Sequence, residues 1–279
     1  MRESSLIAAT DLLGVIDEPR VRIADCRFYL DRPAAGREAF ADGHIPGAIY
    51  LSLDDDLSAP DGPGRHPLPP PADFAARLGQ LGIGNEHRVV VYDDAGGAIA
   101  ARLWWMLRAL GHDNTFVLDG GLQHWQDAGG ALTQETSDHP PATMRLRTSF
   151  AGTVGYDEVN SRREALRLVD ARGVDRYRGE AEPIDPVAGH IPTAVNLPYA
   201  ENLQADGRFD EPDHIRRRFL DLGITTPETT VAYCGSGVTA CHDILAMEVA
   251  GLGTARLYPG SWSDWLERGG EVATEPRPT

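Results

Sequence analysis

Short apolar runs alternate with amphipathic stretches along this chain of 279 residues, and the whole alternation occurs twice. Short β-branched runs are typical of buried strands, and apolar positions spaced by three or four residues are typical of helices. The first half predicts strands over 89–92 and 115–118 and helices over 98–110 and 122–128. The second half predicts strands over 229–233 and 255–257 and helices over 238–250 and 261–268. This alternation predicts an α/β fold whose mostly parallel sheets are covered by helices on both faces.

Four segments of the first half recur in the same order in the second half, each 140 to 146 residues later. The matched segments are Asp25-Cys26-Arg27 with Asp170-Ala171-Arg172, His44-Ile45-Pro46 with His190-Ile191-Pro192, Val90-Val91-Tyr92 with Val231-Ala232-Tyr233, and Gly120-Gly121-Leu122 with Gly260-Ser261-Trp262. Four matches in order indicate a duplicated domain. The stretch around Pro140-Pro141 has no periodicity and is typical of a linker. We therefore expect domains over 1–134 and 152–279, joined by a linker over 135–151.

The charge of the chain argues against several classes of partner. Lys and Arg number 26 and Asp and Glu number 42, which gives a net charge of −16. A surface this acidic repels phosphate backbones and anionic lipids, so we expect neither a nucleic-acid nor a membrane partner. A small anionic substrate would need a local cluster of arginines to bind.

The chain begins without a basic segment followed by an apolar one, so no signal peptide is expected. No stretch approaches the ~18 uninterrupted apolar residues that a membrane helix needs. The three cysteines, Cys26, Cys234 and Cys241, form neither a disulfide framework nor a CxxC pair. These features favour reduced thiols in the cytoplasm. We expect no metal and no cofactor.

The two copies differ at the expected end of their central strand. The second copy has Cys234 followed by Gly235, Ser236 and Gly237, whereas the first copy has Asp93. Ligands of parallel α/β sheets bind at the carboxyl ends of strands, and glycines let a loop turn its N–H groups towards an anion. Such a loop favours a reactive thiolate, although a buried cysteine can also be a simple packing residue.

The other two cysteines are expected to be packing residues. Cys241 lies two helical turns beyond Cys234, and Cys26 directly follows a predicted strand. A cysteine-dependent phosphatase is a further alternative for the Cys234 loop. That class needs arginine six residues after the nucleophile, where this chain has Ala240. The arginine that would clamp a phosphoryl group is therefore absent.

The tandem layout, the two His-Ile-Pro segments, the run from Tyr233 to Ala240 and Gly-Ser-Trp-x-x-Trp near the end resemble the two-domain rhodanese/3-mercaptopyruvate sulfurtransferase family. The resemblance covers nearly the whole chain. It implies two rhodanese-like domains, the first inactive because Asp93 replaces the cysteine and the second catalytic. It also implies that Cys234 takes sulfur from a donor as a persulfide and passes it to cyanide, a thiol or thioredoxin.

The loop sequence bears on the sulfur donor. Relatives that prefer thiosulfate look like Cys-Arg-Lys-Gly, whereas relatives that prefer 3-mercaptopyruvate look like Cys-Gly-Ser-Gly, as this chain does. The resemblance implies that Ser236 works with a histidine and an aspartate from the first domain, which match His66 and Asp54 here. Asp55 and Asp56 are adjacent rivals for the aspartate. Loop residues Gly235, Gly237, Val238 and Thr239 complete the predicted substrate-binding set.

The resemblance assigns Arg176 to the donor anion, and Arg178 is either a second contact or a solvated side chain. Mercaptopyruvate enzymes often carry another arginine nine residues after the first, where this chain has Asp185. This departure leaves thiosulfate as an alternative donor. A non-enzymatic interaction module is a further alternative, because rhodanese folds without the cysteine serve as scaffolds.

Overall fold

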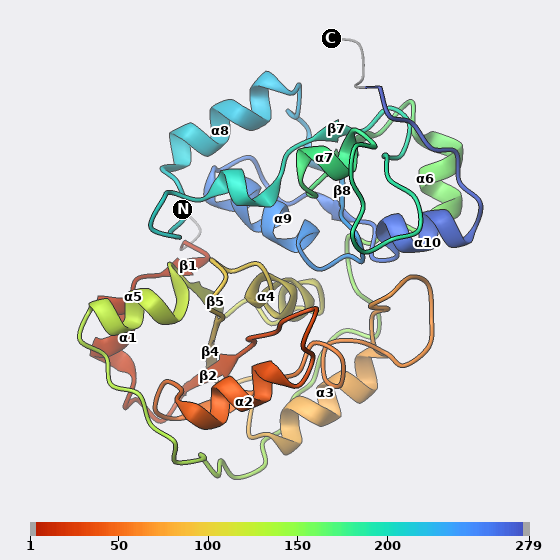
Figure 1. Ribbon diagram of the computed structural model, residues 1–279. Helices are drawn as coiled ribbons and strands as arrows, with labels where there is room; N and C mark the ends of the chain where they lie inside the picture. Colours follow the sequence, from red (N-terminus) through yellow and green to blue (C-terminus); the bar gives the residue numbers. More distant parts are fainter. Residues whose placement is uncertain (1–3, 276–279) are drawn as a thin grey trace. The chain divides into compact units, whose positions relative to one another are not determined.

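The computed structural model describes residues 4–275 and divides into two compact units (Figure 1). Unit 1 consists of Met1–Pro60, Leu68–Ala151 and Ala205–Phe209. Unit 2 consists of Asp61–Pro67, Gly152–Gln204 and Asp210–Thr279. Each unit thus contains one short segment from the other half of the sequence. The two domains expected from the sequence are contiguous and do not include such segments. The stretch predicted to be a linker groups with unit 1.

Unit 1 is built on a five-stranded sheet with the order β1-β5-β4-β2-β3, in which every pair is parallel. The strands are β1 (Leu6–Ile7), β2 (Val21–Asp25), β3 (Ala48–Tyr50), β4 (Arg88–Tyr92) and β5 (Thr115–Leu118). The helices are α1 (Ala9–Val15), α2 (Ala35–Asp42), α3 (Pro71–Gln80), α4 (Ala100–Ala109) and α5 (Gly121–Asp127). The β-branched run predicted as a strand is β4 at the centre of the sheet, where both faces are buried.

Unit 2 repeats this plan with a four-stranded parallel sheet of order β7-β6-β8-β9. The strands are β6 (Arg167–Asp170), β7 (Val195–Asn196), β8 (Thr230–Tyr233) and β9 (Arg256–Leu257). The helices are α6 (Tyr156–Arg162), α7 (Val174–Tyr177), α8 (Pro212–Asp221), α9 (Ala240–Val249) and α10 (Ser261–Glu267), with 3-10 turns η1 (Tyr199–Asn202) and η2 (Pro227–Thr229). The α/β fold with two parallel sheets is therefore confirmed.

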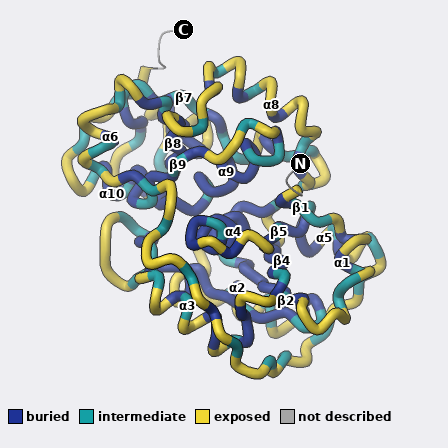
Figure 2. Tube along the Cα trace, turned by 180° about the vertical axis from the view of Figure 1, so that it is seen from behind, coloured by how far each residue is buried: buried dark blue, intermediate teal, exposed yellow. Residues whose placement is uncertain are grey.

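Each unit has its own apolar core between its sheet and its helices. In unit 1 the core includes Ile23, Val90 and Trp125, and in unit 2 it includes Leu168, Val231 and Trp265 in the corresponding places. Figure 2 shows the central strands and helices α4 and α9 in the dark blue of buried residues. Both helices are buried along most of their length. Their sequences are correspondingly apolar on nearly every side.

The matched Asp-x-Arg motifs form the same buried network in each unit. In unit 1, Arg27 pairs with Asp25 at 2.6 Å and donates to the Gly43 carbonyl at 2.8 Å. The Tyr92 hydroxyl donates to Asp25 at 2.6 Å and accepts from the Ile45 amide. The network ties the ends of β2 and β4 to the His-Ile-Pro segment. Loss of one member of a buried ion pair is costly because the other charge stays buried.

In unit 2, Arg172 pairs with Asp170 at 2.6 Å and donates to the Gly189 carbonyl at 2.6 Å. The Tyr233 hydroxyl accepts from the Ile191 amide at 3.1 Å. Burial raises the pKa of Tyr233, so the phenol stays protonated. The repeated motifs are therefore structural in both units. They fix the carboxyl end of β8, directly before Cys234.

Candidate active site

Cys234 directly follows β8, and the loop 234–239 leads into α9, which begins at Ala240 (Figure 1). The Cys234 side chain is buried, and the Gly237 amide donates a hydrogen bond to its sulfur at 3.1 Å. Gly237 has φ +75°, and a Cβ there would lie 2.4 Å from the Pro259 carbonyl oxygen. Only glycine fits this turn. The predicted strand–loop–helix setting of the cysteine is therefore present, with a backbone N–H directed at the sulfur.

The start of α10 holds the backbone of Cys234 in place. The Ser261 hydroxyl accepts a hydrogen bond from the Cys234 amide at 3.1 Å and donates to the Tyr258 carbonyl at 2.9 Å. The Trp262 amide donates to the Cys234 carbonyl at 3.0 Å. Ser261 has φ +54°, an uncommon value for a residue other than glycine. Ser261 is not among the residues expected from the sequence; the one signal there is that the first copy has Gly121 at the matching position.

His66 lies beside the Cys234 loop. Its segment 61–67 groups with unit 2, although the sequence places it in the expected first domain. Its Nδ1 is 2.7 Å from the Ser236 hydroxyl oxygen, and both side chains are buried. The segment 61–67 is fixed where it passes α10, because the Arg65 amide donates to the Ser263 hydroxyl at 3.0 Å. A Cβ on Gly64 would lie 2.4 Å from the Gly260 carbonyl oxygen, so this close approach requires glycine. The structure thus brings together the predicted residues Ser236 and His66.

Two arginines approach the residue that follows the nucleophile. A Cβ added to Gly235 would lie 3.0 Å from Arg65 Nη2 and 3.5 Å from Arg176 Nη2. Asp185 joins them, with one oxygen 2.8 Å from Arg65 Nη1 and the other 2.9 Å from Arg176 Nη2. Glu182 also binds Arg176, at 2.8 Å. The sequence motif indicates Arg176, whereas no motif indicates Arg65.

The remaining predicted residues lie in varied surroundings. Val238 is buried and Thr239 half-buried, and both belong to the turn that precedes α9. Arg178 directly follows α7, is exposed, and takes part in neither ion pair of Asp185. Cys241 donates from its thiol to the Gly237 carbonyl at 3.3 Å, so it packs beneath the turn.

The three consecutive aspartates belong to unit 1 and differ in their surroundings. Asp56 is buried, accepts from the Ser52 amide at 2.8 Å and pairs with Arg77 at 2.6 Å. Asp54 and Asp55 are exposed and line a hollow beside α2. Partial burial and the adjacent Asp55 raise the pKa of Asp54. These contacts give Asp56 a structural role, and the catalytic role of Asp54 stays a prediction.

Unit 1 has a carboxylate where unit 2 has the thiol. One oxygen of Asp93 accepts hydrogen bonds from the amides of Ala95 and Gly97 at 2.9 and 2.8 Å, and the other accepts from those of Ile99 and Ala100 at 2.8 Å. Burial raises the pKa of Asp93, and the four amides oppose this shift. The loop therefore binds an anion that is part of its own chain.

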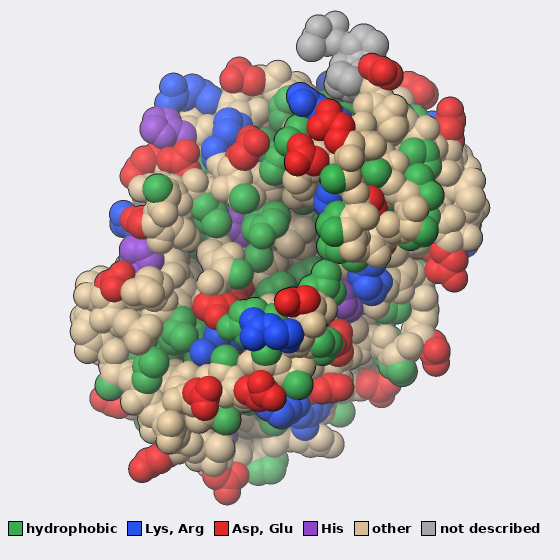
Figure 3. All heavy atoms as spheres, in the orientation of Figure 1, with side chains coloured by type: hydrophobic (Ala, Val, Ile, Leu, Met, Phe, Trp, Pro, Cys, Tyr) green, Lys and Arg blue, Asp and Glu red, His purple; other side chains and the backbone are tan. Residues whose placement is uncertain are grey.

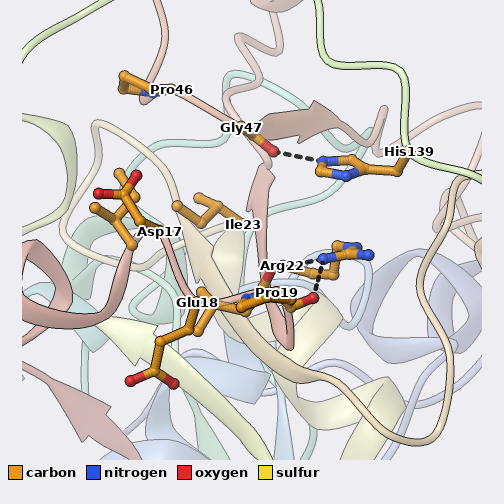
Figure 4. Close-up of a pocket in the computed structure, with 10 residues that line it drawn as sticks. Asp17, Glu18, Pro19, Arg22, Ile23, Pro46, Gly47 and His139 are labelled. Atoms are coloured by element: carbon orange, nitrogen blue, oxygen red, sulfur yellow. Dashed lines mark hydrogen bonds between the residues drawn. The ribbon is translucent and has the colours of Figure 1, made fainter.

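Unit 1 also has a separate pocket, lined by Asp17, Arg22 and His139 among others (Figure 4). It lies beside Val21, where β2 begins, so it is at the opposite end of the strand from Asp25. His139 donates to the Gly47 carbonyl at 2.9 Å, which fixes one wall of the pocket.

Acidic side chains are scattered over the face seen in Figure 3, in keeping with the net charge. No helix within residues 4–275 is long and apolar enough to span a membrane.

Comparison with known proteins agrees with this fold. The family model described as "Rhodanese-like domain" matches residues 8–128 and 156–268. The chain is 43% identical to a protein of Pseudomonas aeruginosa named "Probable 3-mercaptopyruvate sulfurtransferase", covering 99% of this chain and 98% of that one. It is 34% identical to the thiosulfate sulfurtransferase of Mus musculus, covering 90% and 86%. A solved structure of 3-mercaptopyruvate sulfurtransferase from Leishmania major has a TM-score of 0.84 at 33% identity, covering 96% and 76%.

The chain therefore belongs to the family of rhodanese-like domain proteins, with one such domain matched in each half. It is a sulfurtransferase. The family expected from the sequence is confirmed, and so is the enzyme class.

Proposed function

We propose that this sulfurtransferase uses Cys234 to take sulfur from 3-mercaptopyruvate and transfer it to a thiol acceptor. The observation that carries the proposal is the Cys234 sulfur at the end of β8, with the Gly237 amide 3.1 Å away. A thiolate at this position gains from the N–H donor, and a persulfide formed there has the same donor available. Relatives named for 3-mercaptopyruvate and for thiosulfate both support sulfur transfer.

The first step breaks the carbon–sulfur bond of the donor. The Cys234 thiolate attacks the donor sulfur, the bonding electron pair passes to carbon as the pyruvate enolate, and the enolate takes a proton. In the second step an acceptor thiolate attacks the outer sulfur of the Cys234 persulfide, and the Cys234 thiolate leaves. With thiosulfate the bond broken first joins two sulfurs, and sulfite leaves without needing a proton.

Ser236 and His66 are assigned to the proton. The enolate needs one, and the 2.7 Å contact between Ser236 Oγ and His66 Nδ1 provides a path from the imidazole towards the loop. This requirement favours 3-mercaptopyruvate over thiosulfate. Asp54 is proposed to orient His66. Arg176, together with the loop residues 235–239, is proposed to bind the donor anion.

We further propose that unit 1 is catalytically silent. The Asp93 carboxylate fills the loop that matches the Cys234 loop, and a carboxylate cannot carry a persulfide. A small thiol or a thioredoxin-like protein is the proposed acceptor. The cytoplasm is the proposed location, because the three cysteines are free thiols that a reducing compartment preserves.

The test is the ratio of kcat/KM for 3-mercaptopyruvate and thiosulfate, each measured with cyanide as the acceptor. We expect 3-mercaptopyruvate to be preferred. A preference for thiosulfate would overturn the donor assignment and leave the sulfurtransferase class intact. Asp185, at the position where an arginine is expected, is the feature that supports this second outcome.

A further inference from the structure

The site has a second guanidinium that the resemblance did not assign. Arg65 precedes His66 in the segment 61–67 of unit 2, and its Nη2 is the atom nearest to a Cβ built on Gly235, at 3.0 Å. Arg176 Nη2 is 3.5 Å from the same point. Both guanidinium groups therefore lie beside the residue that follows Cys234.

Among the described residues, the hydrogen bonds of the Arg65 guanidinium group use one edge and leave the other without a partner. Nη1 donates to Asp185 at 2.8 Å. Within residues 4–275, Nε is buried and has no hydrogen-bond partner. Nε and Nη2 together form the edge with which arginine grips a carboxylate or a sulfonate through two parallel hydrogen bonds. The Nη2 end of that edge lies beside Gly235, the residue that follows the nucleophile.

Arg176 is arranged differently. Its Nε donates to one oxygen of Glu182 at 2.9 Å, and its Nη2 lies 2.8 Å from the other. Glu182 thus already occupies the corresponding edge of Arg176. Nη2 also donates to Asp185 at 2.9 Å. Asp185 holds the two guanidinium groups at a fixed separation, one on each of its oxygens.

We propose that Arg65 is a donor-binding residue that grips the anionic group of the sulfur donor with its Nε–Nη2 edge, and that Asp185 is the positioning residue that aligns Arg65 with Arg176. Position 185, where the resemblance leads one to expect an arginine, thus carries the carboxylate that orients an arginine from elsewhere in the chain. The proposal rests on the proposed function, because it takes Cys234 as the sulfur acceptor. The ligand chemistry is a small anion: the carboxylate of 3-mercaptopyruvate or the sulfonate-like end of thiosulfate.

The test compares Arg65→Ala and Arg65→Lys with the wild type by steady-state kinetics with both donors. Loss of one charge-assisted anchor should lower kcat/KM by about 10- to 100-fold, mainly through KM. Arg65→Lys should recover only part of this, because an ammonium cannot form the planar two-point contact. Arg217→Ala removes an exposed arginine from α8 and controls for the change in net charge. It should behave as the wild type.

The split between KM and kcat separates anion binding from a merely structural role. If Arg65 only held His66 in place, Arg65→Ala would lower kcat with 3-mercaptopyruvate and leave the KM for thiosulfate unchanged, and this result would overturn the proposal. Unchanged kinetics with both donors would overturn it as well. A wild-type enzyme that transfers no sulfur would instead reject the proposed function.

A double-mutant cycle tests the role of Asp185. Asp185→Asn removes the charge that holds Arg65 in line with Arg176, so it should raise the KM for both donors. The same substitution should change KM much less in the Arg65→Ala background, because the 2.8 Å ion pair is already broken there. Effects of the two substitutions that simply add, in proteins that are folded by circular dichroism, would contradict the pairing.

Discussion

Ser236 Oγ lies 2.7 Å from His66 Nδ1, so a hydroxyl two residues after Cys234 meets an imidazole that is 170 residues earlier in the chain. Both side chains are buried, which limits competition from water for this hydrogen bond. One donor needs a proton for its leaving group and the other does not. This pair is therefore the structural basis for expecting the two donors to respond differently when the proton path is removed.

Ser236→Ala should therefore lower kcat/KM for 3-mercaptopyruvate more than for thiosulfate. General acid–base assistance typically contributes about 10²–10⁴-fold, and sulfite leaves without a proton. The measurement is the ratio of kcat/KM for the two donors in the variant and in the wild type. An equal loss with both donors would mean that Ser236 only shapes the loop, and the proton path through His66 should then be abandoned.

The other two cysteines should be dispensable for sulfur transfer. Cys26 is fully buried, and burial together with Asp25 raises the pKa of its thiol, which disfavours the thiolate. Cys241 is buried beneath the loop, and a serine there can keep the hydrogen bond to the Gly237 carbonyl. We expect Cys26→Ser and Cys241→Ser to retain most of the activity per folded molecule, and Cys234→Ser to retain none. Loss of activity in a folded Cys241→Ser protein would instead place a second thiol in the mechanism.

The sequence predicted the central part of the fold well, because the signals there are local. The β-branched runs of β4 and β8 and the apolar helices α4 and α9 are found within two residues of their expected bounds. The edge strands β1 and β7 have two residues each, too few to show any alternation.

The candidate site was predictable where a motif surrounds the residue, as around Cys234, and less so elsewhere. Arg65 pairs with Asp185, 120 residues away, and no local pattern indicates a contact of that kind. The one available signal was a carboxylate at a position where an arginine was expected. Ser261 could not be predicted for a similar reason. Its hydroxyl accepts a hydrogen bond from the Cys234 amide, which is 27 residues earlier in the chain.

Asp93→Asn should destabilise unit 1 without abolishing sulfur transfer by the folded protein. The amide keeps one acceptor oxygen, while its NH₂ group faces two backbone N–H donors that Asp93 satisfies in the wild type. Buried donors left without an acceptor cost about 1–3 kcal/mol. Urea unfolding followed by tryptophan fluorescence gives the loss, with Asp94→Asn as the neighbouring control. An unchanged unfolding midpoint for Asp93→Asn would refute the assigned role of this carboxylate.

Asp243, buried on α9, should make stability depend on pH. Burial raises the pKa of its carboxyl well above the usual value, although Asn202 donates to it at 2.8 Å. The folded protein therefore holds this proton more tightly than the unfolded chain does. The associated stability is complete below the unfolded pKa of about 3.9 and is lost as pH rises through the folded pKa.

Asp243→Asn stays neutral at every pH, so its free energy of unfolding should fall less than that of the wild type as pH rises from about 4 to about 8. Urea midpoints across this range measure the difference. Asp221→Asn, which changes an exposed carboxylate on α8, is the control and should follow the wild type. Parallel curves for Asp243→Asn and the wild type would contradict the buried-charge argument.

Locating the transferred sulfur tests most directly whether Cys234 carries it. The intact protein is treated with 3-mercaptopyruvate in the absence of an acceptor, alkylated, digested and analysed by mass spectrometry. We expect one added sulfur on the peptide that contains Cys234 and none on those that contain Cys26 or Cys241. The added sulfur should disappear when cyanide is added. Added sulfur at another residue, or none with either 3-mercaptopyruvate or thiosulfate, would show that Cys234 is not the sulfur carrier.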